Sequence, residues 1–410
     1  MHRTCCSFAA WLAILTSASG LAAQVVQGRV VEAGAPVAGV HVLLLDADAR
    51  PITSRLTGPE GRFVFQLYGV RGRYSIVAEM IGRQSTTIGP FAVGEGTTDH
   101  LMVLQPQPVR LEGLRAETAR RCHSRPLPGH ETHTVWEEAR KALAVEELTR
   151  RSLRYRYDIR SFVRELDPFA MHITHEESRY RHSYTGVPFR ARSAPWLIEH
   201  GWVERDAQGT LLYGPTAELL LSEAFLDLYC FHLVRDEARA GQIGLSFQPI
   251  PGRTVPDIKG VLWLDEATAE LRVLEFGYVH LPPDLPLGNR GGQVVYSRLA
   301  TGAWFINEWA IRSPRVVLYS DPSGSEYRQT QRVTGYREDG AQVLRITARD
   351  GTTLFERQRD TLGTSHPQAR RSHAALDTVV VSAWMRGGSS GPFLREIHSL
   401  RAASARLRSP

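Results

Sequence analysis

The sequence predicts a mainly β protein, in which an N-terminal β-sandwich precedes a larger antiparallel β domain with one or two helices. Three observations predict this class. Short apolar alternations separated by glycine and proline fill residues 25–104, and longer alternating runs return between residues 153 and 358. A leader precedes both regions, and the remaining length of the 410-residue chain suits two or three domains.

Residues 1–23 have the pattern of a secretory signal. A basic start leads into an apolar run from Phe8 to Leu15, and the small residues Leu-Ala-Ala precede Gln24. That run is too short to cross a bilayer of about 30 Å, and no later stretch approaches the ~20 apolar residues of a membrane helix. We therefore expect an exported envelope protein that begins at Gln24, located in the periplasm or associated with the outer membrane of a Gram-negative-type bacterium.

The predicted sandwich covers residues 24–106. Pro36 to Gly39 form a turn that leads into a strand with three inward-facing side chains. These are Val40, Val42 and Leu44. Gly61 permits a positive φ in the turn before Phe63, and Phe63 and Phe65 place two rings on one face of the following strand.

An ordered set of short motifs runs through this region. It consists of Gly28-Arg-Val, Pro36-Val-Ala-Gly39-Val-His-Val, Thr57-x-x-x-Gly61-Arg-Phe63-Val-Phe65, Gly72-Arg-Tyr74 and Ile81-Gly82. The set resembles the carboxypeptidase regulatory-like domain, also called prealbumin-like or transthyretin-like. The resemblance implies a transthyretin-like β-sandwich with a carbohydrate-binding-like fold, for which glycan, peptidoglycan or an envelope protein would be the ligand.

The resemblance does not extend to a zinc carboxypeptidase. Such enzymes share a His-x-x-Glu motif, and none of the 15 histidines here has a glutamate three residues downstream. Two histidine groups are interpreted as solvated linker and strand residues. One is His130 with His133, near Cys122 and His123, and the other is His172 with His175. We therefore expect no metal, no cofactor and no catalytic residue, and an uncharacterised hydrolase ranks behind a binding protein.

A second formal enzyme signature lies near the C-terminus. Gly387-Gly-Ser389-Ser-Gly391 matches the G-x-S-x-G nucleophile elbow, but only His398 follows it, beside Glu396. A true elbow lies between a strand and a helix and has its acid and histidine far downstream. The segment is interpreted as a flexible hinge.

Residues 107–130 are rich in proline and arginine and predict a linker to a second domain at 131–358. Within that domain we expect one helix from Thr134 to Ser152, with Glu137 completing a capping box, and another from Thr216 to Leu228. Long alternating strands around a helix predict a curved sheet or half-barrel. The run from Gly260 to Asp265, followed by residues 271–278, resembles the periplasmic lipoprotein-carrier half-barrels.

Two cysteines remain in the mature chain, Cys122 and Cys230. In an oxidising compartment an isolated pair is most simply a disulfide, although two buried free thiols would give the same sequence. We expect the bridge.

The last 52 residues, 359–410, form a basic tail. In it, residues 361–410 hold seven arginines against two acidic residues, and the whole chain carries a formal charge of +6. In an exported protein such a tail favours contact with a membrane surface or a protein partner rather than with nucleic acid. Residues 393–407 also show apolar positions at helical spacing, which predicts either a surface-binding amphipathic helix or a terminal helix packed on the domain.

One run in the tail is competent to form a strand. It reads Asp377, Thr378, Val379, Val380, Val381, Ser382 and Ala383. The run resembles the TonB box, the segment through which outer-membrane receptors pair with TonB by strand addition, and an ordinary edge strand is the alternative. Taken together, the sequence predicts a non-catalytic envelope binding or scaffold protein, with a TonB-linked transport or signalling accessory as the runner-up.

Overall fold

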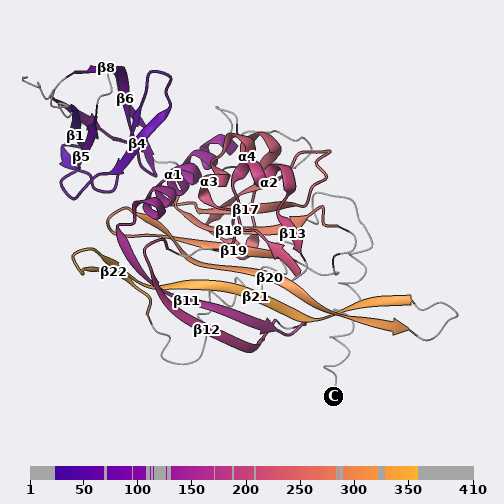
Figure 1. Ribbon diagram of the computed structural model, residues 1–410. Coiled ribbons are helices and arrows are strands. Elements are labelled where there is room, and N and C mark those ends of the chain that lie inside the picture. Colours follow the sequence, from indigo (N-terminus) through magenta and orange to yellow (C-terminus); the bar gives the residue numbers. More distant parts are fainter. Residues whose placement is uncertain are drawn as a thin grey trace, which may run out of the picture.

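A computed structural model describes residues 24–358, except for 69–71, 95, 108–110, 112–113, 115–125, 127–130, 170, 187–188, 207–208, 283–284, 286–289 and 322–327. The described chain forms a small sandwich of short strands and a large antiparallel sheet with helices against one face (Figure 1). The predicted class, a mainly β protein with a sandwich before a larger antiparallel domain, is confirmed.

Two four-stranded sheets face each other in the N-terminal sandwich. The first contains β1 (Gln24–Glu32), β2 (Ala35–Pro36), β5 (Arg62–Leu67) and β9 (Thr97–Val103), with β9 parallel to β1. The second runs in the order β4 (Pro51–Leu56), β3 (His41–Leu45), β6 (Gly72–Glu79) and β8 (Thr86–Val93). A short pair, β7 (Arg83–Gln84) and β10 (Gln105–Pro106), closes the region.

The core of the sandwich agrees with the expected inward-facing pattern. Val40, Val42 and Leu44 are fully buried, and the Phe63 and Phe65 rings lie 5.7 Å apart on β5. Gly61 has a φ of +68°, and a Cβ atom there would lie 2.4 Å from the Val30 carbonyl oxygen. The turn therefore requires glycine both for its backbone conformation and for space.

The large sheet is open and has the strand order β12-β11-β21-β20-β19-β18-β17-β16-β15, with β22 beside β21. Its strands are β11 (Tyr155–Leu166), β12 (Ile173–Ser183), β15 (Tyr229–Val234), β16 (Gln242–Pro249), β17 (Asp257–Asp265), β18 (Leu271–Val279), β19 (Gly291–Arg298), β20 (Trp304–Asp321), β21 (Arg328–Ala348) and β22 (Thr353–Glu356). The 18-residue β20 and the 21-residue β21 form a hairpin that projects beyond the other strands (Figure 1). A separate hairpin joins β13 (Val203–Asp206) to β14 (Gly209–Leu212).

The helices cover one face of this sheet. They are α1 (Glu131–Ser152), α2 (Ala194–His200), α3 (Ala217–Leu220) and α4 (Glu223–Leu228), and one 3-10 turn, η1, spans Glu237–Arg239. The buried face of α1, including Val135, Ala139 and Leu143, packs into the main core, and the Trp136 ring lies 6.0 Å from that of Phe231 on β15. Among the described helices, none is both long and apolar enough to cross a membrane.

Two helix predictions need correction. The first helix begins at Glu131, so Thr134 lies inside it and cannot be its N-cap; an acidic residue in the first turn suits the positive end of the helix dipole. The second expected helix is two short ones, because Ser222 starts α4 as a new N-cap, just as Thr216 starts α3. The expected linker is also partly built into the fold, since Leu111 is fully buried in the main core.

Candidate ligand pocket between the two domains

Helix α1 joins the sandwich to the large sheet through charged side chains. Arg140 Nη2 lies 2.7 Å from Glu79 Oε1 and its Nη1 lies 3.2 Å from Oε2, a two-point contact with the last residue of β6. Burial opposes ionisation of Glu79, but His41 and Arg140 outweigh it and lower its pKa to about 2. The carboxylate is thus held charged at the junction.

A second set of contacts comes from Glu138 and Lys141, which lie on either side of Arg140 in the helix sequence. The Gly82 N–H donates to Glu138 Oε2 (2.8 Å), and Lys141 Nζ donates both to Glu138 Oε1 (2.7 Å) and to the Arg83 carbonyl oxygen (2.9 Å). Glu138 and Lys141 are both buried. Since a buried ion pair is tolerated when further hydrogen bonds satisfy its atoms, these contacts fix the position of residues 82–83 on the helix.

The backbones of the two domains also touch directly. A Cβ atom on Gly39 would lie 2.6 Å from Gly302 Cα, and both glycines have positive φ values, +71° and +85°. Leu56 and Ile81 of the sandwich pack against the main core. The domains are therefore in van der Waals contact at two places besides the charged one.

A pocket of about 590 Å³ lies between these contacts. It is lined by Ala38, Arg55, Leu56, Thr57, Gly58, Pro59, Leu148, Thr149, Arg151, Ser152, Arg154, Tyr155, Ala300 and Thr301. The walls thus come from the sandwich, the C-terminal turn of α1, the start of β11 and the β19–β20 turn. The volume falls in the range of small-molecule sites in proteins.

The polar part of the pocket is basic. Arg151 is paired, to Glu147 and, at 3.3 Å, to Glu218. Arg55 donates to the carbonyl oxygen of its neighbour Ser54 (3.0 Å), and Arg154 has neither a hydrogen bond nor an ion pair within the described part of the chain. Two guanidinium groups therefore border an apolar pocket without an acidic partner among the described residues.

The comparison with protein families bears on the sandwich side of this pocket. The family described as "Carboxypeptidase regulatory-like domain" matches residues 25–104, which is the whole of the sandwich up to Leu104. Residues 25–104 are a carboxypeptidase regulatory-like domain. The regulatory-like domain thus supplies Arg55 and the turn Thr57–Pro59 to the pocket.

No curated protein matches the chain. Among solved structures, the chain is similar to a proposed carbohydrate-binding protein from Bacteroides uniformis ATCC 8492, with 9% identity, 59% of this chain and 98% of that chain covered, and a TM-score of 0.18. It is also similar to BcpA, the major pilin subunit of Bacillus cereus, with 10% identity, coverage of 82% and 93%, and a TM-score of 0.17. At such TM-scores neither likeness bears on fold or function.

A buried acid lies behind the pocket, on the far side of Thr149. Glu146 lines a hollow of about 10 Å³, and Thr149 borders both this hollow and the larger pocket. Burial, together with the negative charge of the neighbouring Glu147, raises the pKa of Glu146 to about 8. Glu146 is therefore a neutral carboxylic acid at pH 7, close to the pocket against which the regulatory-like domain packs.

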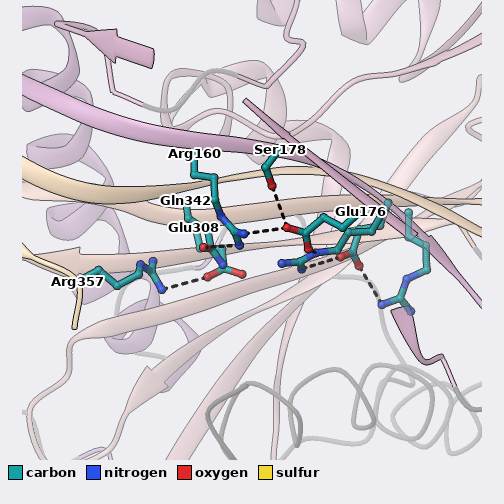
Figure 2. Close-up of polar contacts among 9 residues, drawn as sticks. Arg160, Glu176, Ser178, Glu308, Gln342 and Arg357 are labelled. Atoms are coloured by element: carbon teal, nitrogen blue, oxygen red, sulfur yellow. Dashed lines mark hydrogen bonds and ion pairs between the residues drawn. The ribbon is translucent and has the colours of Figure 1, made fainter. Parts of the chain in front are cut away.

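A larger charged network lies on the other face of the sheet, where β11, β12, β20 and β21 run side by side (Figure 2). Arg160 and Arg164 both bond Glu176, at 2.8 and 2.7 Å, and Arg357 lies 3.4 Å from Glu308. Arg312 and Arg164 likewise flank the buried Glu338. Since each carboxylate already has an arginine across the strands, we interpret the network as structural.

The residues singled out in the sequence lie apart from this pocket. His172 and His175 are exposed and face different acids, Asp167 (3.9 Å) and Glu177 (3.6 Å). His133 lies on α1, with its Nδ1 3.1 Å from the Pro126 carbonyl oxygen. Within the described residues no group of three or more His, Cys, Asp or Glu side chains could hold a metal ion.

Other predicted sites lie outside the described residues. Cys230 is buried on β15, but Cys122 is not described, so the bridge between them stays a prediction. The same holds for His123 and His130, the TonB-box-like run 377–383, the segment 387–391 and the predicted helix at 393–407.

Sequence reasoning missed the pocket entirely. Arg55, Arg151 and Arg154 come from two domains, and no local motif distinguishes them from the other arginines. A signal did exist for Glu138, Lys141 and Glu146. Glu146 falls within the apolar face of the helix, between Val135 and Ala139, and the other two border that face next to Val145. Charged residues on an otherwise apolar face indicate a second packing surface.

Proposed function

We propose that this chain is a non-catalytic envelope protein that binds a small anionic molecule between its regulatory-like domain and its larger β domain. The observation that carries the proposal is the pocket of about 590 Å³, with mainly apolar walls and with Arg55 and Arg154 unpaired to any described acid. A guanidinium without an acid suits a carboxylate, sulfate or phosphate group.

The walls set a second requirement on the ligand. Leu56, Leu148 and Tyr155 offer apolar surface to the part of the ligand that carries no charge. The C-terminal turn of α1 forms one wall, and its helix dipole places a partial negative charge there. Arg151, which is already paired to Glu147 and Glu218, compensates this partial charge. Selection of the anion therefore falls to Arg55 and Arg154. The carbohydrate-binding-like fold suggests a glycan as the ligand, and a glycan bound by these two arginines would have to be acidic.

Binding of the fluorescent probe anilinonaphthalene sulfonate tests the pocket, because the probe joins an anionic group to an apolar body. In the full mature chain, the double variant Arg55→Met and Arg154→Met should bind the probe at least tenfold more weakly than the wild type. The matched control is Arg62→Met with Arg156→Met, which removes two exposed arginines that do not line the pocket. Equal affinities of the two double variants would overturn the proposal.

A pair of sugars then tests the class of ligand. Glucuronate differs from glucose by a carboxylate, so calorimetry should detect binding of glucuronate alone, and the Arg55→Met and Arg154→Met variant should lose it. If the probe binds in the pocket but neither sugar does, the anion site stands and the acidic-glycan assignment fails.

A further inference from the structure

Strand β12 is paired on one side only. It runs antiparallel to β11 from Tyr157↔Ser183 to Leu166↔Ile173, and no strand of the described residues pairs with its other side. Figure 1 shows β12 as the outermost strand at this end of the large sheet. Its outer backbone N–H and C=O groups are a template for another strand.

This strand carries charged side chains but lacks other features that usually protect an exposed edge. The 11-residue strand contains no lysine and no proline, and its one register irregularity lies at the Ile173 end. Large apolar or aromatic side chains on the strand and its flanks are exposed. They are Phe169 (77%), Ile173 (51%), Tyr180 (71%) and Tyr184 (56%). An exposed edge with exposed large side chains is typical of an interaction surface.

The charges on β12 are ordered about its centre. Glu176 and Glu177 precede Ser178, and Arg179 and Arg181 follow it. If two copies of β12 pair antiparallel about a twofold axis at Ser178, Glu177 of each copy lies opposite Arg179 of the other. The contact then contains two opposite-charge pairs related by symmetry, and Glu176 faces Tyr180.

The alternative registers are unfavourable. Because side chains alternate between faces, a symmetric antiparallel pair that keeps its faces aligned must be centred on a residue. Centring on Glu177 opposes that glutamate to its own copy, and centring on Arg179 opposes two arginines. In the Ser178 register His175 faces Arg181, and no charged residue faces its own copy.

We infer that β12 is the dimer interface of this protein, at which two copies join their large sheets by antiparallel pairing centred on Ser178. The main-chain hydrogen bonds of the added strand supply the affinity, and the Glu177–Arg179 pairs fix the register. The partner is a second copy of this chain because the strand's own charge order is complementary to itself. The inference does not depend on the ligand pocket.

Charge reversal with rescue tests the interface in the full mature chain. Sedimentation velocity should show a dimer for the wild type and at least a tenfold weaker dimer for Glu177→Lys or Arg179→Glu, since each puts like charges opposite one another twice. The combination of both changes should restore the dimer. Arg156→Glu, an exposed reversal on β11, is the control and should leave the dimer unchanged. Both tested side chains are exposed, so folding is not at risk.

Crosslinking then tests the register. In a Ser178→Cys variant the two cysteines would have Cα atoms about 4.5–5.5 Å apart, within the range of a disulfide. In an Arg181→Cys variant they would lie about 20 Å apart, because six residues of strand rise separate them. Oxidation should therefore link only the first variant. A monomeric wild type, a dimer that survives both single reversals, or equal crosslinking of the two variants would each overturn the inference.

Discussion

Arg140 Nη2 lies 2.7 Å from Glu79 Oε1, and this contact joins the long helix of the larger domain to the end of a strand in the regulatory-like domain. Both side chains are mostly buried, and the other guanidinium contact, at 3.0 Å, is to Glu137 on the same helix. The pairing therefore helps to hold both walls of the pocket in place.

Removal of one partner of this pair should be costly. Arg140→Met leaves the Glu79 carboxylate buried with only His41 near it, and we expect a loss of about 3 kcal/mol in the free energy of unfolding. Urea unfolding measures this loss in the free energy of unfolding. Arg345→Met, which breaks an exposed pair with Glu356, should cost at most about 1 kcal/mol. Similar costs for the two variants would show that the junction does not depend on Arg140.

Stability should fall in acid because of Glu79. Its pKa is about 2 in the folded chain against an ordinary value of 4.5, so its contribution is present above pH 4.5 and is lost as the pH falls towards 2. The contribution is on the order of 3 kcal/mol. Melting temperatures measured from pH 7 down to pH 2 should decline more steeply for the wild type than for Glu79→Gln. Parallel curves would contradict the assignment.

Glu146 should change the pH dependence of stability in the direction opposite to that of Glu79. Its pKa is raised from 4.5 to about 8, so the folded chain holds this proton more tightly than the unfolded chain does. The resulting stability is present below pH 4.5 and is lost as the pH rises through 8. Glu146→Gln, which resembles the neutral acid in shape, should raise the melting temperature relative to the wild type at pH 9 but not at pH 4. A benefit that is the same at both pH values would argue against a buried neutral acid.

The contact between Gly39 and Gly302 predicts a difference between two glycine substitutions. Gly39→Ala adds both backbone strain and a Cβ atom 2.6 Å from Gly302, whereas Gly34→Ala, with a φ of +83° and no atom within 4 Å, adds strain alone. We expect a loss of about 1 kcal/mol at Gly34 and about 2 to 3 kcal/mol at Gly39. The denaturant midpoints of the two variants measure these losses. Gly39→Ala should also weaken probe binding in the pocket, and Gly34→Ala should not.

The TonB-box-like run 377–383 remains a prediction that calls for its own test. If it is a tether recognised by strand addition, Val380→Pro should abolish a crosslink to TonB without changing the melting temperature, since proline removes a backbone donor. Val379→Thr, which keeps the donor, serves as the control. A melting temperature lowered by several degrees in Val380→Pro would place the residue in a folded core instead.

The parts of the fold that the sequence predicted are those that local patterns determine. The Phe63 and Phe65 strand, the Gly61 turn and the strand at 260–265 each need only neighbouring residues to be recognised. The start of α1 was misplaced because Thr134 and Glu137 satisfy the capping pattern while the helix already begins at Glu131. A cap motif indicates where a helix could begin, and the packing of the preceding residues decides where it does.

The pocket could not be predicted because it exists only where segments distant in the sequence meet. Arg55 and Arg154 are separated by almost a hundred residues, and each is an exposed arginine in a basic protein. Glu146 differs from these arginines, because it falls on the apolar face of its helix and the sequence therefore carried a signal for its burial. The large domain covers it, since Tyr157, Trp304 and Phe305 line the same hollow.

The position of α1 also bears on how the chain unfolds. One side of the helix, with Val135 and Leu143, completes the core of the large sheet, and another side, with Glu138 and Lys141, anchors the regulatory-like domain. If the helix detaches from either domain, buried groups of the other domain become exposed. We therefore expect the two domains to unfold as one cooperative unit, and calorimetry of the full chain should record a single transition in which the sandwich and the sheet melt together.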